Sequence, residues 1–258
     1  MSNLMVVITV PLLLFFGVLI FIDIGYRIGR RQRARGDESP QEDIGPVDAA
    51  VFGLLGLTLA FTFSGASDRL AVRRAQIVQE ANAIGTAYLR LDLLPVSDQP
   101  PIRTLFREYL EARIEVYDKF LDRTASNAAL EKSNGLQREI WSRSIPASRR
   151  MPDTAASLLL IPALNEMFDI STTRTMAAFT HAPAVILVLL VVLSFVAAVL
   201  SGTAMSSQSR RNVLQMVLFA VAISFTVYVV LDLEYPRAGI INLTAMDEAI
   251  LQLRETMK

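Results

Sequence analysis

The chain has 258 residues, of which 52% are hydrophobic and only 19% are charged, and its 25 basic side chains balance its 25 acidic ones. It has no cysteine and a single histidine, which excludes disulfides, thiolate nucleophiles and metal sites built from several histidines. A net charge of zero provides no overall field to attract nucleic acid.

Four runs contain no Asp, Glu, Lys or Arg: residues 4–22, 49–66, 182–200 and 213–231. A bilayer core is crossed by about 17–25 apolar helical residues, so each run predicts a transmembrane helix. The first run is preceded by no basic residue and is followed by Asp23 rather than by a small-residue cleavage site. We therefore interpret it as a retained span rather than a signal peptide.

A solvated connection of basic and then acidic residues follows the first span, and the second span begins at Pro46. The sequence thus predicts an all-α protein in three parts: two spans in residues 1–66, a helical-bundle insert in residues 67–181, and two spans with a short tail in residues 182–258. Within the insert, apolar residues at helical spacing predict a continuation of the second span to residue 94 and a helix from residue 100. They also predict a helix over about 128–144, and one from Asp153 that runs into the third span at Pro183 with a kink at Pro162.

The side of the membrane that the insert faces stays open. Seven Lys and Arg residues flank the spans in the two short loops and five flank them on the opposite side. This small difference favours short loops inside the cell and the insert outside, without deciding the question.

The sequence contains none of the common nucleotide-binding, zinc-protease or hydrolase motifs. Ser64 precedes a glycine at the end of the second span, which indicates a packing surface of small residues rather than a nucleophile. His181 lies one residue before the third span, where a polar aromatic residue at the interface is common. We therefore expect no catalytic residue, no metal site and no cofactor.

The second span has three distinct faces. Steps of four or three residues place a polar set on one face of the helix: Thr58, Thr62, Gly65, Arg69 and Arg73. Small residues form a second face suited to close helix packing: Gly53, Gly56 and Ala60. The bulky residues Phe52, Leu59 and Phe63 form a third.

Two explanations of the polar face remain open. It suits the lining of a pore, with basic side chains at the mouth that enrich anions. Alternatively, the threonines bond their own i−4 carbonyls and the arginines bind lipid phosphates. Farther along, Gly85 predicts close helix packing, because glycine in a helix costs about 1 kcal/mol relative to alanine. Asp232, Glu234 and Arg237 after the fourth span form either a cation site or, as we favour, an interface cap with an internal ion pair.

Three segments carry a resemblance to a known family: residues 52–66 (FGLLGLTLAFTFSGA) with Arg73 and Arg74, residues 80–95 (EANAIGTAYLRLDLLP), and residues 232–239 (DLEYPRAG). They resemble a bacterial family of membrane proteins described as bestrophin-like. Bestrophins are pentameric anion channels whose second span lines the pore with an apolar neck, and whose insert is cytoplasmic. The resemblance implies a pore-lining second span and a homo-oligomer, with five copies as in bestrophins.

We therefore predict a multi-pass protein of the bacterial inner membrane that forms a homo-oligomeric ion channel, preferring anions such as chloride. Phe52 and Phe63 would gate by dewetting, Thr58 and Thr62 with Gly65 would line the pore, and Arg69 and Arg73 would set the charge preference. Its partners would be the bilayer, inorganic ions and copies of itself, and not nucleic acid. The alternative is a non-conducting sensor or scaffold whose insert binds another protein.

Overall fold

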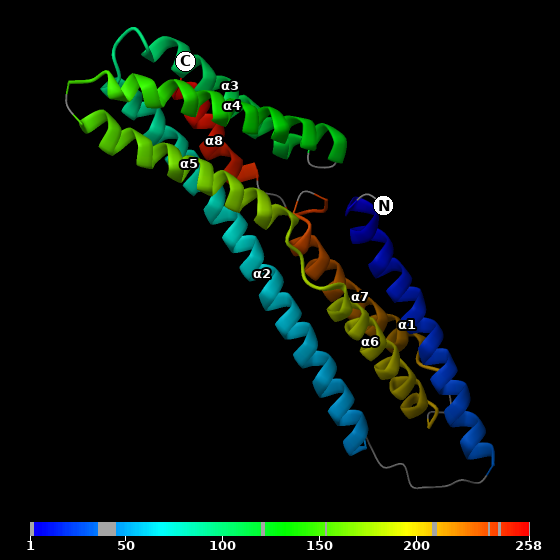
Figure 1. The fold of residues 1–258 in the computed structure, drawn as a ribbon. Coiled ribbons are helices and arrows are strands. Elements are labelled where there is room, and N and C mark those ends of the chain that lie inside the picture. The colour runs from blue at the N-terminus through cyan, green and yellow to red at the C-terminus, as the bar shows by residue number, and fades with distance from the viewer. Residues whose placement is uncertain are drawn as a thin grey trace. The chain divides into compact units, whose positions relative to one another are not determined.

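The computed structural model describes residues 3–35, 45–119, 122–152, 154–207, 211–236, 238–241 and 244–257. Helices dominate these residues, and no strand occurs among them, which confirms the all-α fold (Figure 1). The helices are α1 (Asn3–Ala34), α2 (Pro46–Leu89), the 3₁₀ helix η1 (Arg90–Leu93), α3 (Gln99–Asp118), α4 (Arg123–Arg149), α5 (Ala155–Phe179), α6 (Ala184–Met205), α7 (Val213–Glu234) and α8 (Thr244–Thr256).

Four segments are long and apolar enough to cross a membrane: Leu4–Ala34, Pro46–Leu93, Ala155–Met205 and Val213–Glu234. They contain the four charge-free runs, so the four predicted spans are confirmed. The chain divides into two compact units. The membrane unit comprises Met1–Leu70 and His181–Ile241, and the insert unit comprises Ala71–Thr180 and Asn242–Lys258.

In the membrane unit, α1 packs along both α6 and α7 (Figure 1). Glycines make the contact between α1 and α6 very close. A Cβ on Gly25 would lie 2.1 Å from the carbonyl oxygen of Val199, and a Cβ on Gly202 would lie 2.1 Å from that of Ile22. In lipid, such close van der Waals contact replaces the hydrophobic effect as the force that holds helices together.

The first half of α2 touches these helices along one side only. Leu55 is buried in the same apolar cluster as α1, α6 and α7, and Phe52 meets Phe219 of α7 edge to face with ring centroids 6.4 Å apart. Only 11% of its most apolar window is buried, against 28% for the windows of the other three segments. The second span therefore leaves the largest share of its apolar window uncovered within the chain.

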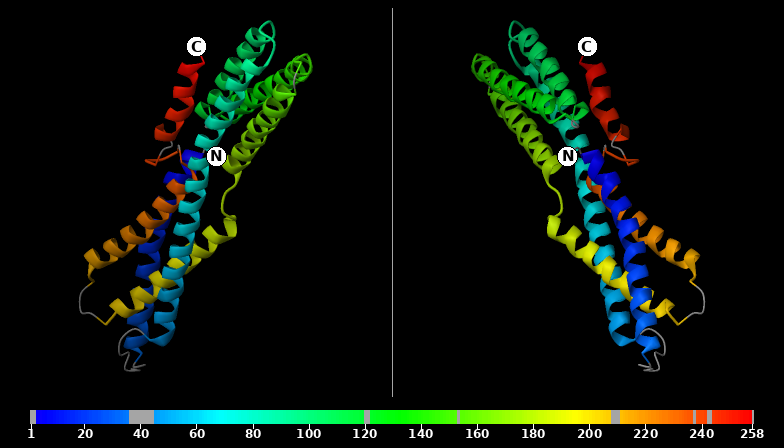
Figure 2. Two further views of the ribbon diagram at one scale, coloured as in Figure 1. Left: turned by 90° about the vertical axis from the view of Figure 1, so that its left-hand side faces the viewer. Right: turned by 90° about the vertical axis from the view of Figure 1, so that its right-hand side faces the viewer.

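In the insert unit, α3 packs on α4 and α4 packs on α5. Figure 2 shows α5 on one side of the second half of α2 and α8 on the other side. The predicted apolar stripe of α3 is confirmed, because Ile102, Phe106, Tyr109 and Val116 are buried. The sequence analysis expected only a short tail after the last span, whereas α8 is part of the insert unit, where it packs on α3 and buries Ile250 and Met257.

The helix ends differ from the prediction in two places. α4 runs from its cap Asp122 to Arg149 and contains Pro146, which lies three residues before the helix ends. α5 is described from Ala155, and Asp153 lies outside the described residues. α5 and α6 are separate helices, because the chain leaves the helical conformation at Thr180, before Pro183.

Candidate functional site: the outward face of the second span

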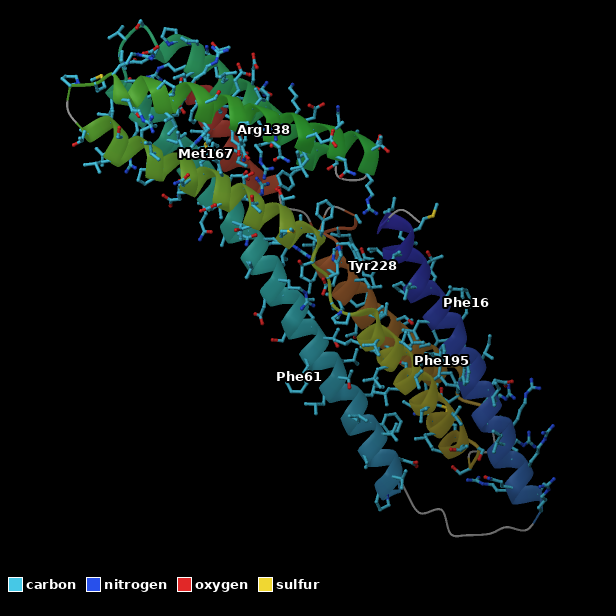
Figure 3. The ribbon with its side chains drawn as sticks, viewed as in Figure 1. Phe16, Phe61, Arg138, Met167, Phe195 and Tyr228 are labelled. Carbon is cyan, nitrogen blue, oxygen red and sulfur yellow. The ribbon has the colours of Figure 1, made fainter. Side chains whose placement is uncertain are left out.

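α2 has a buried side and an exposed side. Leu55, Ala66 and Leu70 are 3%, 0% and 4% exposed and mark the side that packs within the membrane unit. The opposite side carries four exposed residues at spacings of four, three and four: Leu57, Phe61, Ser64 and Asp68. We call these four residues the outward stripe. Phe61 is 70% exposed and projects from α2 on the side away from α6 and α7 (Figure 3).

The predicted polar face lies on the other side of the helix. Thr58 and Thr62 are half-buried and flank Leu55 and Ala66 on the helix surface. Their hydroxyl groups donate to the carbonyl oxygens of Leu54 and Thr58 at 2.7 and 2.6 Å. The structure thus shows the i−4 bonding that the sequence left as an alternative to an ion-lining role.

The small residues of α2 face outward. Gly53, Gly56 and Ala60 are exposed, and a Cβ added to either glycine would meet no atom within 4 Å. The bulky residues of α2 lie in different surroundings. Phe63 is 45% exposed, whereas Phe52 packs against Phe219. Within one chain, therefore, the predicted packing face of α2 has open space beside it.

The other spans expose a different kind of surface. The exposed residues of α1, α6 and α7 include large apolar side chains along much of each helix: Leu12, Leu13, Phe16, Ile20, Val185, Val188, Leu189, Val192, Val196, Leu214, Leu218, Val221 and Phe225. α2 also exposes Leu57 and Phe61, but it mixes them with glycines, an alanine and serines. Large apolar side chains suit lipid, whereas small ones let a neighbouring helix approach closely.

Arg69, expected to charge a pore mouth, is bound inside the membrane unit. Its Nη2 donates to Oε1 of Glu234, which is buried at the end of α7. His181 places Nδ1 3.7 Å from the other carboxylate oxygen of Glu234 and packs its ring on Tyr235 with centroids 4.5 Å apart. A Cβ on Gly65 would lie 3.2 Å from Nη1 of Arg69, so the predicted face residue Gly65 gives the guanidinium room to lie along the helix.

Arg73 is also occupied. It is only 7% exposed, and its guanidinium donates to the carbonyl oxygens of Ala177 and Thr180 at 3.1 and 2.7 Å. Carbonyls at the end of a helix lack intrahelical donors, so Arg73 caps the C-terminal end of α5.

The segment after the fourth span forms a cap. Oδ2 of the buried Asp232 accepts hydrogen bonds from the backbone N–H groups of Ile240 and Ile241, both at 3.1 Å. Glu234 supplies the ion pair with Arg69, while Arg237 lies outside the described residues. This geometry supports the cap rather than the cation site, and the described residues contain no group of three potential metal-ligating side chains.

The insert unit contains a buried charge cluster that the sequence analysis missed. Glu80 of α2 and Arg113 of α3 are both fully buried, with Arg113 Nε 2.6 Å from Oε1 of Glu80. Arg174 of α5 donates to the other carboxylate oxygen, and its guanidinium lies 3.7 Å from the ring centroid of Tyr117. The one available signal was an arginine, Arg113, between apolar positions of the α3 stripe.

The cluster perturbs the ionisable groups around it. Burial alone would lower the pKa of Arg113, but the charge of Glu80 and the hydrogen bond to it raise this pKa above its ordinary value. The pKa of Tyr109 is also raised, chiefly by burial, although the positive charge of Arg113 opposes the change. Arg113 therefore remains charged, and the cluster ties together α2, α3 and α5.

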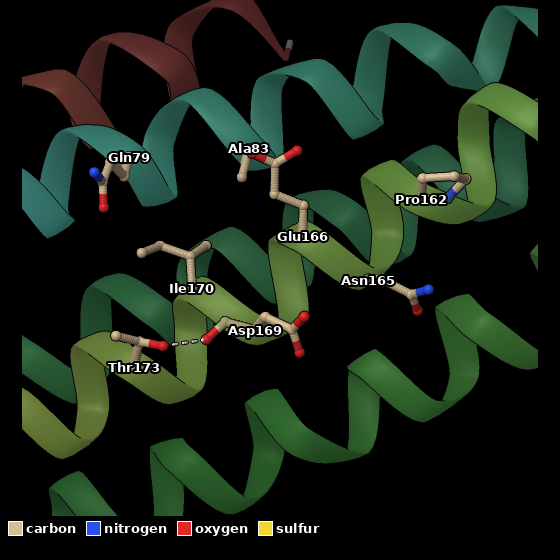
Figure 4. A pocket seen from close by; sticks show the side chains of 8 residues that line it. All are labelled: Gln79, Ala83, Pro162, Asn165, Glu166, Asp169, Ile170 and Thr173. Carbon is tan, nitrogen blue, oxygen red and sulfur yellow. Dashed lines mark hydrogen bonds between the residues drawn. The ribbon is translucent and has the colours of Figure 1, made fainter.

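Two further features of the insert unit bear on its surface. Gly85 faces α8, where a Cβ would lie 3.2 Å from Cδ1 of Leu253. An open groove of about 650 Å³ lies between α2 and α5 (Figure 4). Five of its lining residues are polar and three are apolar: Gln79, Asn165, Glu166, Asp169 and Thr173 with Ala83, Pro162 and Ile170.

Comparison with known proteins shows which family and which solved structures this chain is similar to. The family model of the Bestrophin-like domain matches residues 13–245. A crystal structure of a mutant of a bacterial bestrophin homolog from Klebsiella pneumoniae is similar in fold, with a TM-score of 0.68 and 13% identity over 95% of this chain and 98% of that one. A further crystal structure of the Klebsiella pneumoniae homolog gives 0.64 and 14% over 94% and 97%.

A crystal structure described only as a membrane protein gives a TM-score of 0.65 and 14% identity over 95% of this chain and 98% of that one. No curated protein matches the sequence. The family match covers most of the chain, from within the first span to beyond the fourth, while the structural similarity at this low identity reports the fold alone. The chain is a membrane protein that belongs to the bestrophin-like family.

Proposed function

We propose that the chain forms a homo-oligomeric ion channel in the bacterial inner membrane, with α2 of each copy lining a central pore. Copies would meet through the small residues Gly53, Gly56 and Ala60, and the outward stripe would face the pore. The number of copies implied by the resemblance to bestrophins is five.

The observation that carries this proposal is the exposed surface of α2. Its apolar window is the least buried of the four, and the exposed side includes glycines, serines and Asp68, which are poor lipid-facing residues. Other copies of α2 would cover the small residues, and water in a pore would solvate the polar ones.

The outward stripe also suggests where the pore is gated. Leu57 and Phe61 are one helical turn apart, about 6 Å along the axis, and are 53% and 70% exposed. Repeated around an axis, they would form an apolar constriction that closes by dewetting. The sequence-based lining of Phe52, Thr58, Thr62, Phe63 and Gly65 stays a prediction, and it requires α2 to be rotated relative to its own bundle.

The anion preference predicted from the sequence rested on Arg69 and Arg73. Both guanidinium groups bind partners within the chain, so they offer less charge to a pore than the sequence suggested. Anion preference stays a prediction from the sequence alone, and the charge on the outward stripe argues for the opposite preference, as developed below.

Reconstitution of the purified protein into planar bilayers tests the proposal. Phe61→Ala should raise the open-state conductance, because it removes a ring of bulky apolar side chains from the constriction. Phe16→Ala is the matched control, since Phe16 is 59% exposed on α1 among lipid-facing residues, and it should leave conductance unchanged.

The possible outcomes separate the hypotheses. An effect of Thr62→Ala with none of Phe61→Ala would support the sequence-based lining over the outward stripe. If the wild-type protein carries no current under any ionic condition, the channel proposal is wrong and the non-conducting scaffold takes its place.

A further inference from the structure

Asp68 ends the outward stripe and is the charged residue on it. It is exposed and follows the apolar run by two residues, so it lies about 10 Å beyond Phe61 along the helix at 1.5 Å per residue. No ion pair or hydrogen bond of its carboxylate is found among the described residues. A carboxylate at this position is therefore available to ions at the end of the apolar constriction.

The basic residues next to Asp68 point elsewhere. Arg69 is turned by about 100° around the helix, where it binds Glu234, and Arg73 caps α5. Arg74 is exposed, but six residues of helix place it about 120° around the axis from Asp68. The outward stripe itself thus carries a negative charge, although most of the charged residues next to Asp68 in the sequence are arginines.

We propose that Asp68 is the charge-selecting residue of the pore and that the channel prefers small inorganic cations. This inference rests on the proposed function, and it names the class of ion that the same site admits. In an oligomer, the copies of Asp68 form a ring of carboxylates at one mouth of the pore.

Such a ring acts through the local ion concentration. A ring of Asp or Glu side chains is a common source of cation selectivity, because it enriches cations and repels anions at the pore entrance. Mobile ions screen the charges over a Debye length of about 10 Å at 0.1 M salt and about 3 Å at 1 M. The selectivity due to Asp68 is therefore strongest in dilute salt.

The test is the reversal potential of reconstituted protein in a potassium chloride gradient. The current through the wild-type protein should reverse at a potential displaced from zero toward the equilibrium potential of potassium. Asp68→Asn should lower the ratio of cation to anion permeability by about tenfold near 0.1 M salt, the low end of the enrichment that charged clefts produce, and Asp68→Arg should invert the preference. Both effects should shrink near 1 M salt.

Glu131→Arg is the matched control, because Glu131 is an exposed carboxylate on α4 outside the membrane unit, and it should leave the reversal potential unchanged. Size-exclusion chromatography of each variant in mild detergent checks that assembly is retained. A conducting protein whose permeability ratio is the same with Asp68, Asn or Arg overturns the inference and leaves the channel intact. The absence of any current overturns the proposed function itself.

Discussion

The buried cluster of Glu80, Arg113 and Arg174 makes a sharp prediction about the insert unit. In Glu80→Gln, a neutral amide replaces the carboxylate that accepts from both arginines. The shape of the side chain is nearly unchanged, so the substitution removes charge and acceptor strength rather than volume. We expect the insert unit to lose stability.

The magnitude follows from burial. Glu80 and Arg113 are fully buried and the Arg174 side chain is 4% exposed, so water cannot solvate the guanidinium groups that lose their counter-charge. Removing one partner of a buried pair costs about 3–5 kcal/mol. For a protein of this size each kcal/mol lowers the unfolding midpoint by about 2–4 °C, which predicts a fall of between about 6 and 20 °C.

Trp141 makes the measurement specific to the insert unit. It is the single tryptophan of the chain and packs on Phe168 with ring centroids 6.3 Å apart. Thermal unfolding in mild detergent, followed by tryptophan fluorescence and by circular dichroism, gives the midpoint for each variant. Glu139→Gln is the matched control, because its ion pair with Arg143 has side chains that are 43% and 48% exposed. It should shift the midpoint by no more than about 2 °C, since exposed pairs contribute little.

A second variant separates the cost of an orphaned charge from the value of the cluster. Replacing Glu80, Arg113 and Arg174 together by methionine or leucine should recover much of the stability lost in Glu80→Gln, because no buried charge then lacks a partner. A Glu80→Gln midpoint as high as that of the Glu139→Gln control would show that Glu80 does not hold the arginines in solution.

Three further predictions concern helix packing, topology and pH. Gly202→Leu should destabilise the fold by about 1–3 kcal/mol through overpacking. Gly56→Leu should instead leave the single chain folded and weaken the oligomer. Equal effects of the two variants on thermal unfolding and on particle size in detergent would contradict this. Because the chain has no native cysteine, single cysteines introduced at Ser207 and Asn127 can be probed with a membrane-impermeant thiol reagent. The two cysteines should react from opposite sides of the membrane. Reaction of both from the same side would mean that a span has been miscounted. The pKa of Tyr109 is raised in the folded protein, so the unfolded chain loses the phenol proton at a lower pH, and the free energy of unfolding should fall as pH rises above about 10. In Tyr109→Phe, the unfolding midpoint should fall less steeply with pH. An unchanged dependence of the midpoint on pH would refute the role given to Tyr109.

The sequence determined the class of this protein because the signals for it are local. A run of 18 or 19 uncharged residues must be a helix in lipid, whatever surrounds it, since no water satisfies its backbone. The apolar stripe of α3 likewise fixes which side of that helix is buried. The resemblance to the bestrophin-like family could also be detected from the sequence, because it rests on three short segments of it.

Only the tertiary structure decided what the polar residues of α2 contact within the chain. Periodicity places Thr58, Thr62, Arg69 and Arg73 on one face, but it does not say whether that face meets a pore or the chain's own helices. The partners of these arginines lie far away in sequence, at Glu234 for Arg69 and on α5 for Arg73. The same holds for Glu80, whose two arginines come from α3 and α5. The free energy of a charge depends on its distance to a counter-charge and on its burial, and both are set by how helices pack rather than by their order along the chain.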